Sequence, residues 1–364
     1  MIFGALDIAT VPALARDGRV AVLAHSHKVG AKRMGKGTAL DAAALERLKD
    51  AGIRVVEAAL PEPGDVGEDE AATACAASLL DAPLGEGTRL TADRASTGRV
   101  NLRAARAGLF AVKPALVDRL NAIDARLTIA TLAPFTRVER GELVATVKII
   151  PFFVPSDAVA RWRVCVRDDA YNGANARDNT DVRDGAIGVR PWRAMRVAHL
   201  STVLDGTKPN VLDKTRRALA ARLDATQATL MPERRVAHER DALAGALEDT
   251  SRDAPGLVIV FGASAVTDER DVVPDAIRSA GGTVERVGMP VDPGNLLVLG
   301  TLGGARVIGA PGCARSPASN GFDLVLDRLL AGIAVDGDDL ARMGVGGLLK
   351  ETPRPRPREA SDTL

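Results

Sequence analysis

Aromatic side chains are scarce in this chain, which has one Tyr, two Trp and seven Phe among its 364 residues. Proteins that bind single-stranded nucleic acids stack bases on aromatic side chains, so the composition argues against that class. Cysteine is scarce as well, and Cys75, Cys165 and Cys313 show neither metal-binding spacing nor an even-numbered disulfide framework. We therefore expect a protein of a reducing compartment, the cytoplasm.

Net charge is also nearly absent, since 48 Lys and Arg residues balance 47 Asp and Glu residues to give +1 at pH 7. No overall field steers such a chain toward nucleic acid or a membrane surface. Residues 1–15 contain Asp7 and only a short apolar run, which fits neither a secretory signal nor a membrane span. We expect a protein of two or three domains with no nucleic-acid or membrane partner.

The first half of the chain mixes helical and extended patterns. Asp41 is placed to cap a helix that Gly52 ends. Two runs rich in β-branched residues, 127–132 and 143–150, predict strands. The sequence therefore predicts an N-terminal α+β, β-rich domain over residues 1–166.

The second half alternates strands and helices. The polar stretch 167–190, rich in Asn, Asp and Gly, predicts a linker or surface loop where limited proteolysis should cut first. After it, Leu257–Phe261 is an apolar strand of the kind that is buried on both faces. The alternation predicts a three-layer α/β domain over 191–340, with helices on both faces of a mostly parallel sheet. A hairpin at 303–304 should add one antiparallel edge strand, and residues 341–364 predict an extended tail.

Three irregular loops follow strands of this second domain, at residues 262–271, 288–295 and 309–317. In an open α/β sheet, ligands bind beyond the carboxyl ends of the strands. Small residues let the backbone approach a ligand, and free N–H groups at two converging helix starts favour a phosphate. The sequence therefore predicts an anion site at this edge. The candidate binding residues are Gly262, Ala263, Ser264, Ala265, Pro311, Gly312, Arg315 and Ser316.

Three acidic residues in these loops are candidate catalytic groups. Asp271, within reach of Asp268, is a candidate metal ligand, with a dipole-stabilised helix-start carboxylate as the alternative. We expect Asp271 to face the loop 311–316. Asp292 is either a third acid of the site or a turn residue.

Other loop residues also have two interpretations. Ser264 either donates to a phosphate or closes its own loop. Arg315 and Ser316 either clamp a phosphate or lie on the surface, and a guanidinium suits bidentate phosphate contacts. Cys313 is expected to be a small buried residue, with a reactive thiol as the alternative.

The segment Gly30–Thr38 nearly matches the phosphate-binding P-loop. Gly37 separates Lys36 from Thr38, and residues 25–28 part the segment from its strand. A P-loop needs strand, loop and helix directly joined, with the hydroxyl next to the Lys. We therefore interpret the segment as a basic loop that attracts anionic ligands. Its cations are Lys28, Lys32, Arg33 and Lys36.

The loops of the second domain resemble those of the molybdopterin-binding family of molybdenum-cofactor biosynthesis proteins. Residues 270–274, Arg-Asp-Val-Val-Pro, resemble its Arg-Asp-x-x-Pro signature. Residues 309–312, Gly-Ala-Pro-Gly, resemble its Gly-x-Pro-Gly loop, and residues 289–294 occupy the place of its Lys-Pro-Gly segment. The resemblance covers roughly residues 195–335.

A narrower resemblance is to a bacterial subfamily in which this domain precedes a cytidylyltransferase domain. It is carried by residues 261–265, 288–300 and 311–323, and in the first half by Ser96–Leu102 and Thr146–Phe152. We expect this chain to lack the cytidylyltransferase domain.

The chain departs from the family pattern at several positions. Ala263 stands where the family has a second Gly, and Ala265 is bulkier than Gly. Cys313 and Ala314 replace a polar residue and a Pro, and the Lys of the Lys-Pro-Gly segment is missing. These replacements argue against adenylyl transfer and molybdate insertion as the better-known members perform them. Molybdopterin binding depends on backbone and loop shape and is expected to be retained.

The resemblance implies a cytoplasmic, homo-oligomeric protein that binds molybdopterin and presents it for metal insertion, nucleotide attachment or delivery. As an enzyme it would be a transferase acting on molybdopterin, with molybdate, Mg²⁺ or a nucleoside triphosphate. Its partners would be a cytidylyltransferase or a molybdoenzyme. Two alternatives stay open: a non-catalytic cofactor carrier, and a nucleotide-processing hydrolase on the same fold, related to pyridine-nucleotide salvage.

Overall fold

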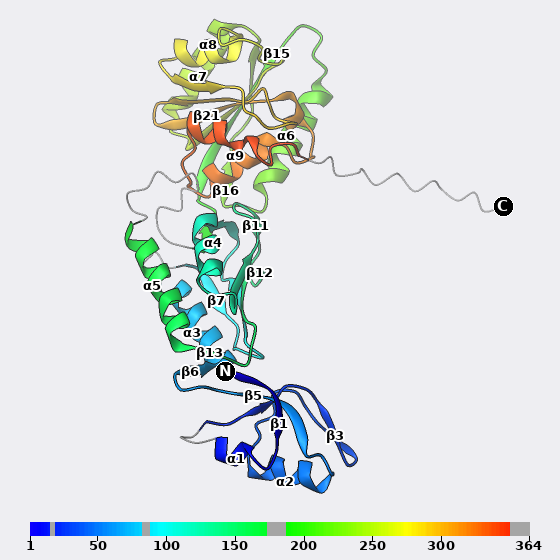
Figure 1. Ribbon diagram of the computed structural model, residues 1–364. Coiled ribbons are helices and arrows are strands. Elements are labelled where there is room, and N and C mark those ends of the chain that lie inside the picture. The colour runs from blue at the N-terminus through cyan, green and yellow to red at the C-terminus, as the bar shows by residue number, and fades with distance from the viewer. Residues whose placement is uncertain (15–18, 82–87, 173–186, 350–364) are drawn as a thin grey trace, which may run out of the picture. The chain divides into compact units, whose positions relative to one another are not determined.

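The structure is a computed structural model that describes residues 1–14, 19–81, 88–172 and 187–349 (Figure 1). The chain divides into two compact units, Met1–Arg190 and Pro191–Leu364. Each unit has hydrophobic core clusters formed only by its own residues.

The N-terminal unit is built from short sheets and five helices within the described residues, and its α+β, β-rich character agrees with the prediction. Its sheets have the strand orders β1-β5-β2, β10-β12-β8-β7 and β11-β9-β14, with the pairs β13-β6 and β3-β4. The strands are β1 (Ile2–Asp7), β2 (Val22–Leu23), β3 (His27–Val29), β4 (Lys32–Met34), β5 (Val55–Leu60), β6 (Asp65–Gly67), β7 (Leu90–Ala92), β8 (Arg99–Ala104), β9 (Gly108–Val112), β10 (Leu127–Thr131), β11 (Arg137–Val138), β12 (Leu143–Ile149), β13 (Phe153–Pro155) and β14 (Ile187–Pro191). The helices are α1 (Val11–Leu14), α2 (Ala42–Asp50), α3 (Glu68–Leu80), α4 (Pro114–Ile123) and α5 (Ser156–Asn172).

Helix α2 packs on the small sheet β1-β5-β2. Asp41 caps the helix as predicted, because its carboxylate accepts a hydrogen bond from Ala44 N at 2.8 Å. Gly52, with φ +74°, turns the chain back after the helix, a conformation that glycine adopts without steric penalty. Leu23 and Leu48 are fully buried between helix and sheet, so this part of the unit has a core of its own.

Helices α3 and α5 lie side by side in the second core of this unit (Figure 1). Trp162 of α5 is fully buried there and provides the largest side chain of the cluster. Cys75 of α3 is buried too, and burial raises the pKa of its thiol to about 12. Cys75 is therefore an inert core residue.

The expected linker over 167–190 is folded at both ends, which corrects the prediction. Helix α5 continues into it, and there the Asp169 carboxylate accepts a hydrogen bond at 3.0 Å from Nζ of Lys113, the N-cap residue of α4. A polar residue that suggested a loop is thus paired within the fold. Strand β14 occupies the other end and pairs with β9. Residues 173–186 lie outside the described residues.

The C-terminal unit alternates strands and helices along the chain. Its strands are β15 (Met195–Val203), β16 (Ala228–Leu230), β17 (Arg234–Ala237), β18 (Leu257–Phe261), β19 (Thr283–Val287), β20 (Val298–Leu302) and β21 (Ala305–Ala310). Its helices are α6 (Pro209–Leu223), α7 (Arg240–Arg252), α8 (Val272–Ser279), α9 (Gly321–Leu330) and α10 (Gly337–Ala341), with 3₁₀ turns η3 (Gly312–Arg315) and η4 (Arg342–Gly344).

These strands form one sheet in the order β16-β15-β18-β21-β20-β19, and β17 also pairs with β15. Strands β15 to β18 and β21 are parallel, so the mostly parallel sheet is confirmed. The prediction of an antiparallel edge strand was wrong. Strand β20 is antiparallel but lies inside the sheet, and β19 forms the edge. Strand β20 is buried along nearly its whole length and therefore needs a neighbour on each side.

Helices cover both faces of this sheet, which confirms the layered α/β fold (Figure 1). Leu247 of α7 and Ile277 of α8 pack with Val260 of β18 on one face. On the other face, Phe261 of β18 contacts Phe322 of α9, with ring centroids 6.3 Å apart. In the described part of the chain, none of the helices combines the length and the apolar character that a membrane crossing requires.

The extended tail expected from residue 341 begins later than predicted. Helix α10 and turn η4 continue the folded unit, and residues 345–349 follow them. We call residues 345–349 the strap. Arg286 of β19 donates from Nη1 to Gly337 O at 3.5 Å, so this segment starts beside the edge strand. Backbone hydrogen bonds join the strap to Asp292, which donates to Gly347 O and accepts from Leu349 N, each at 2.9 Å, and such long-range pairing leaves no local sequence pattern. Residues 350–364 lie outside the described residues.

We expect a fragment of residues 191–349 to fold alone, because its sheet and both helix layers come from this segment. Urea unfolding followed by circular dichroism should show one cooperative transition. A fragment that unfolds without cooperativity would contradict this expectation.

Candidate ligand-binding site

Three strands of the C-terminal sheet end at the same edge, as the sequence predicted. Phe261 of β18 is in register with Ala310 of β21. Val298, the first residue of β20, pairs with both Val287 of β19 and Gly309 of β21. The carboxyl ends of β18, β19 and β21 therefore lie at the same edge. The loops that leave this edge are the first loop, 262–271, the second loop, 288–297, and the third loop, 311–320.

The first loop begins with a tight backbone turn. A Cβ atom on Gly262 would lie 2.8 Å from Ser264 O, so only glycine fits there without a shift. Ala263 N donates to Thr202 Oγ1 at 2.8 Å, which ties the loop to β15. Ser264 and Ala265 are exposed, and within the described residues their N–H groups have no hydrogen-bond partner. These two N–H groups can therefore bind an anion.

The two acids of the first loop are held by the loop itself. Asp271 caps α8, with Oδ1 accepting from Val272 N at 2.7 Å and Oδ2 from Thr267 N at 3.0 Å. Asp268 accepts from Arg270 N at 2.8 Å and pairs with the Arg270 side chain at 3.3 Å. These bonds to Arg270 hold the pKa of Asp268 below its usual range. Asp271 lies at the same edge as the third loop, with both carboxylate oxygens bonded to backbone.

The third loop carries Arg315, which joins it to two other elements. Arg315 Nη2 donates to Gly262 O, and Nη1 donates to Thr215 Oγ1 of α6, each at 2.8 Å. Its guanidinium carbon lies 5.4 Å from the centre of the Phe261 ring. Burial lowers the pKa of Arg315, while five N–H donors leave this group able to bind an anion besides its two protein partners.

The remaining residues of the third loop mix free and engaged groups. The N–H groups of Gly312 and Cys313 have no partner among the described residues. Ser316 closes its own loop, because its hydroxyl accepts from Ala318 N at 3.3 Å. Burial raises the pKa of the Cys313 thiol, which disfavours a reactive thiolate. This loop therefore offers two N–H groups and one cation.

Side-chain caps close part of both helix starts that follow these loops, so fewer helix N–H groups are free there than the sequence predicted. Asp271 caps α8, and Asn320 caps α9 in a capping box with Asp323. Gly321 N at the start of α9 donates to Pro293 O of the second loop at 2.8 Å. Anion binding at this edge therefore depends on loop N–H groups and Arg315.

Arg222 of α6, which the sequence analysis did not single out, holds the third loop from beneath. Its Nε donates to Asp323 Oδ1 at 2.6 Å, and Nη1 donates to Ala314 O at 3.1 Å. Its Nη2 donates to Ser316 O at 2.8 Å and to Ala318 O at 3.3 Å. The residue is only 8% exposed. A charge on the leucine stripe of a helix is the sequence signal that marks such a residue.

The second loop returns toward the third loop through two close-packed glycines. A Cβ atom on Gly294 would lie 2.7 Å from Gly321 Cα, a backbone atom, so position 294 leaves no space for a side chain, and a Cβ atom on Gly321 would lie a tight 3.1 Å from the Met289 sulfur. The Asp292 carboxylate is exposed. With the Asn295 amide oriented so that its nitrogen faces acceptors, this nitrogen donates to Asp292 Oδ1 at 2.7 Å and to Val291 O at 3.2 Å. Among the three candidate acids, Asp292 is the one whose carboxylate lacks a backbone N–H or cationic partner in the described structure.

A buried polar cluster lies at the end of β15 near Arg315. Ser201 Oγ donates to Glu233 Oε1 at 2.7 Å and lies 3.2 Å from His199 Nε2. His199 is 1% exposed, and its Nδ1 has no hydrogen-bond partner among the residues that the structure describes. Burial lowers the pKa of His199 to about 4, against the opposing effect of Glu233, so the imidazole is neutral at pH 7. The carboxylate bonds to the serine rather than to His199 Nδ1, which differs from a nucleophilic triad.

No group of three or more His, Cys, Asp or Glu side chains able to hold a metal ion occurs in the described ranges. Asp271, the predicted metal ligand, therefore has no such set of partners around it within those ranges.

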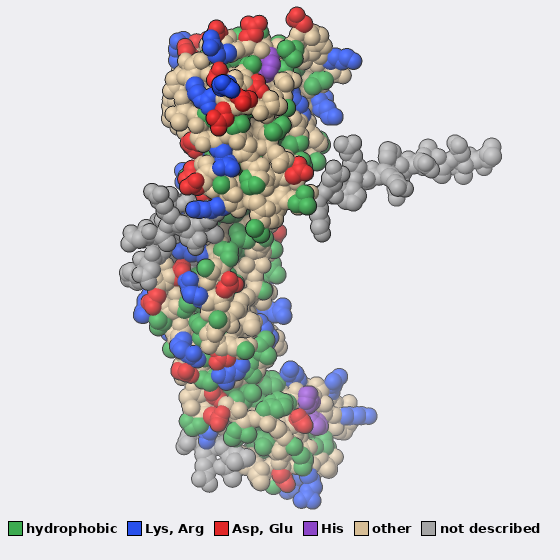
Figure 2. Space-filling model, turned by 45° about the horizontal axis from the view of Figure 1, so that its top comes forward, with side chains coloured by type: hydrophobic (Ala, Val, Ile, Leu, Met, Phe, Trp, Pro, Cys, Tyr) green, Lys and Arg blue, Asp and Glu red, His purple; other side chains and the backbone are tan. Residues whose placement is uncertain are grey.

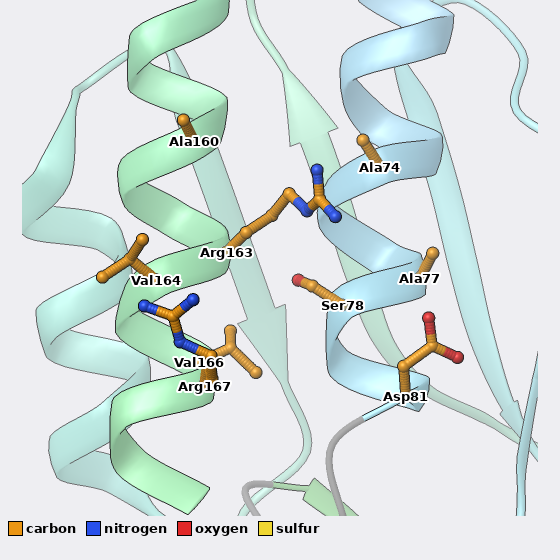
Figure 3. Close-up of a pocket in the computed structure, with 9 residues that line it drawn as sticks. All are labelled: Ala74, Ala77, Ser78, Asp81, Ala160, Arg163, Val164, Val166 and Arg167. Carbon is orange, nitrogen blue, oxygen red and sulfur yellow. The ribbon is translucent and has the colours of Figure 1, made fainter.

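Two hollows of the N-terminal unit include none of the loop residues. One is an open groove of about 660 Å³ between α3 and α5, where alanines line both helices. Figure 3 shows Arg163 reaching from α5 toward Ala74 and Ser78 of α3. The other, of about 570 Å³, lies around residues 61–67. Small side chains explain the groove, and neither hollow contains a candidate site residue.

The near match to a P-loop forms a β-hairpin. Strands β3 and β4 pair antiparallel, with Lys28 opposite Arg33 and Gly30 at φ +60° in the turn. The helix that a P-loop requires is not directly joined to it, so the hairpin is a basic surface feature. Figure 2 shows Lys and Arg side chains beside histidine side chains at the lower end of the view.

Comparisons with known proteins bear on the C-terminal unit. Residues 200–331 match the family model described as a probable molybdopterin binding domain. The match runs from within β15 to the end of α9 and contains all three loops, so the predicted family resemblance of this segment is confirmed. A search among curated proteins gave no match.

Solved structures that are similar to much of the chain include the following one. It is the molybdopterin biosynthesis moea protein from Pyrococcus horikosii, at 14% sequence identity and a TM-score of 0.29. The similarity covers 77% of this chain and 81% of that chain. With this score, the likeness adds nothing to the argument about individual residues.

We expect Arg222→Met to destabilise the protein by about 3–5 kcal/mol, because Asp323 and three carbonyl groups would lose a buried cationic partner. Arg217→Met is the matched control, since Arg217 is an exposed arginine of the same helix. It should stay within about 0.5 kcal/mol of the wild type. Urea unfolding measures both, and equal values for the two variants would contradict the role of Arg222.

We expect His199 to make stability fall as the pH falls. The unfolded chain takes up the proton near the ordinary pKa of 6.5, whereas the folded imidazole resists it down to about 4. Protons therefore favour unfolding in this window, and the free energy of unfolding should drop by about 2 kcal/mol from pH 7 to pH 5 because of His199. His199→Gln should remove this part of the pH dependence, and His238→Gln should retain it. Identical pH slopes in wild type and His199→Gln would contradict the assignment.

Proposed function

We propose that this protein binds molybdopterin at the edge formed by the three loops and acts in molybdenum-cofactor biosynthesis. The observation that carries the proposal is the match of residues 200–331 to the probable molybdopterin binding domain. The matched segment contains the edge where free N–H groups and a cation gather. Edges of this kind are the usual ligand-binding position in open α/β sheets.

The phosphate of the ligand is placed between the first and third loops. Four N–H groups point to this placement, those of Ser264, Ala265, Gly312 and Cys313. Arg315 bonds to both Thr215 and Gly262, so its guanidinium is already oriented before the ligand arrives. A fixed cation loses little side-chain entropy on binding, and charge-assisted bonds to phosphate are stronger than neutral ones.

Asp292 is our choice for the acid that acts on the ligand. Both carboxylate oxygens of Asp271 accept hydrogen bonds from backbone N–H groups, and Asp268 pairs with Arg270. A carboxylate repels a phosphate or molybdate oxygen, so Asp292 is assigned to accept a hydrogen bond from an N–H group of the pterin. Asp271 and Asp268 keep a supporting role, because they shape the first loop.

The biochemical role that we propose is presentation of bound molybdopterin for metal insertion, nucleotide attachment or delivery. Molybdate or a nucleoside triphosphate would be the second substrate of a transferase. A cytidylyltransferase or a molybdoenzyme would be the partner of a carrier. Both versions use the same first step, which is binding of the phosphate by the loop N–H groups and Arg315.

We expect the wild-type protein to retain molybdopterin in equilibrium dialysis, and Arg315→Gln to weaken binding about 10- to 100-fold. The loss corresponds to about 1.5–3 kcal/mol for one hydrogen-bonded charge. Asp292→Ala should weaken binding about tenfold, whereas Asp292→Asn retains an acceptor oxygen and should lose less.

Arg217→Gln serves as the control, because Arg217 is exposed on α6 and bonds to no loop in the described structure. Its affinity should equal that of the wild type. Absence of molybdopterin binding by the wild type, or equal affinities of Arg315→Gln and Arg217→Gln, would contradict the proposal.

A further inference from the structure

The second loop is fixed at several points along its length. At its base, Gly288 N donates to Leu297 O at 2.8 Å and Met289 N donates to Asn295 O at 2.9 Å. At Pro293, the carbonyl accepts the N–H group of Gly321 at 2.8 Å. None of these bonds reaches Asp292, so other contacts must determine where its carboxylate lies.

The strap supplies those contacts from both sides of Asp292. Asp292 N donates to Gly347 O, and Leu349 N donates to Asp292 O, each at 2.9 Å. The two segments form a parallel bridge between Asp292 and Leu348. The backbone of Asp292 thus has both of its polar groups bonded to the strap, while its carboxylate stays exposed beside Asn295.

Side-chain burial contributes little to this contact. Val345 is 101% exposed and Leu348 is 81% exposed, although both are apolar. The close approach depends instead on Gly347. A Cβ atom there would lie 2.4 Å from Pro290 O and 2.6 Å from Met343 O, and both are backbone atoms that cannot rotate away. The strap is therefore held by backbone bonds that require a glycine at one position.

We propose that the strap is a positioning element of the ligand site, which fixes the second loop so that the Asp292 carboxylate meets the bound pterin. This inference rests on the proposed function for the identity of the ligand. The sequence predicts a plain tail after residue 340, because Val345 and Leu348 do not belong to a periodic apolar pattern of the kind that packs into a core. With Asp292 held before binding, the ligand does not have to order the loop.

The test uses the full chain with Gly347→Ala and the matched control Gly344→Ala. A Cβ atom on Gly344 would meet Pro290 Cβ at 3.6 Å, which is ordinary van der Waals contact, so the control should leave the strap in place. Two readouts are needed: hydrogen exchange of the Asp292 and Leu349 N–H groups without ligand, and molybdopterin affinity by equilibrium dialysis. Gly347→Ala should speed both exchange rates at least tenfold and weaken binding about five- to tenfold.

A double-mutant cycle separates positioning from general destabilisation. In the Asp292→Ala background, Gly347→Ala should cause no further loss of affinity, because the carboxylate that the strap positions is already gone. Equal exchange in the Gly347→Ala and Gly344→Ala variants, or a full affinity loss that persists without Asp292, would overturn the inference. Failure of the wild type to bind molybdopterin would overturn the proposed function instead, while the exchange rates would still decide whether the strap holds the loop.

Discussion

The candidate site depends on the hydrogen bonds that the buried guanidinium of Arg222 donates to the third loop. This guanidinium neutralises Asp323 and donates to carbonyl groups of Ala314, Ser316 and Ala318. Carbonyl groups of an irregular loop have no partners in a sheet or helix, and leaving them buried without donors is costly. One planar cation with five donors satisfies them together. The third loop can therefore be irregular and still have a defined shape.

Specific contacts connect the third loop to the other loops of this edge and fix their positions. Arg315 connects it to the first loop at Gly262. Gly321, at the start of α9, connects it to the second loop through the carbonyl group of Pro293 and the close contact with Gly294. The strap completes the series at Asp292. Each contact uses a glycine or a buried charge, because these residues allow backbones to approach or supply several donors in a small volume.

At the two helix starts of this edge, capping decides which N–H groups are available to an anion, and the direction of the helix alone does not. Sequence and topology bring α8 and α9 to the predicted edge, yet Asp271 and Asn320 already satisfy N–H groups at their first turns. A capped terminus stabilises the fold and no longer offers those donors to a ligand. The anion-binding capacity lies instead in the exposed backbone of Ser264 and Gly312 and in the neighbours that follow them.

The sequence by itself determined the alternation of strands and helices, the cap at Asp41, the mostly parallel sheet and the common edge of the three loops, because these follow from local periodicity and turn chemistry. Tertiary structure alone decided the inner position of β20, the pairing of Asp169 in α5, the burial of Arg222 and the attachment of the strap to Asp292. These features join residues far apart in the chain. Their free energy comes from partners that a local pattern does not contain, so only the folded chain specifies them.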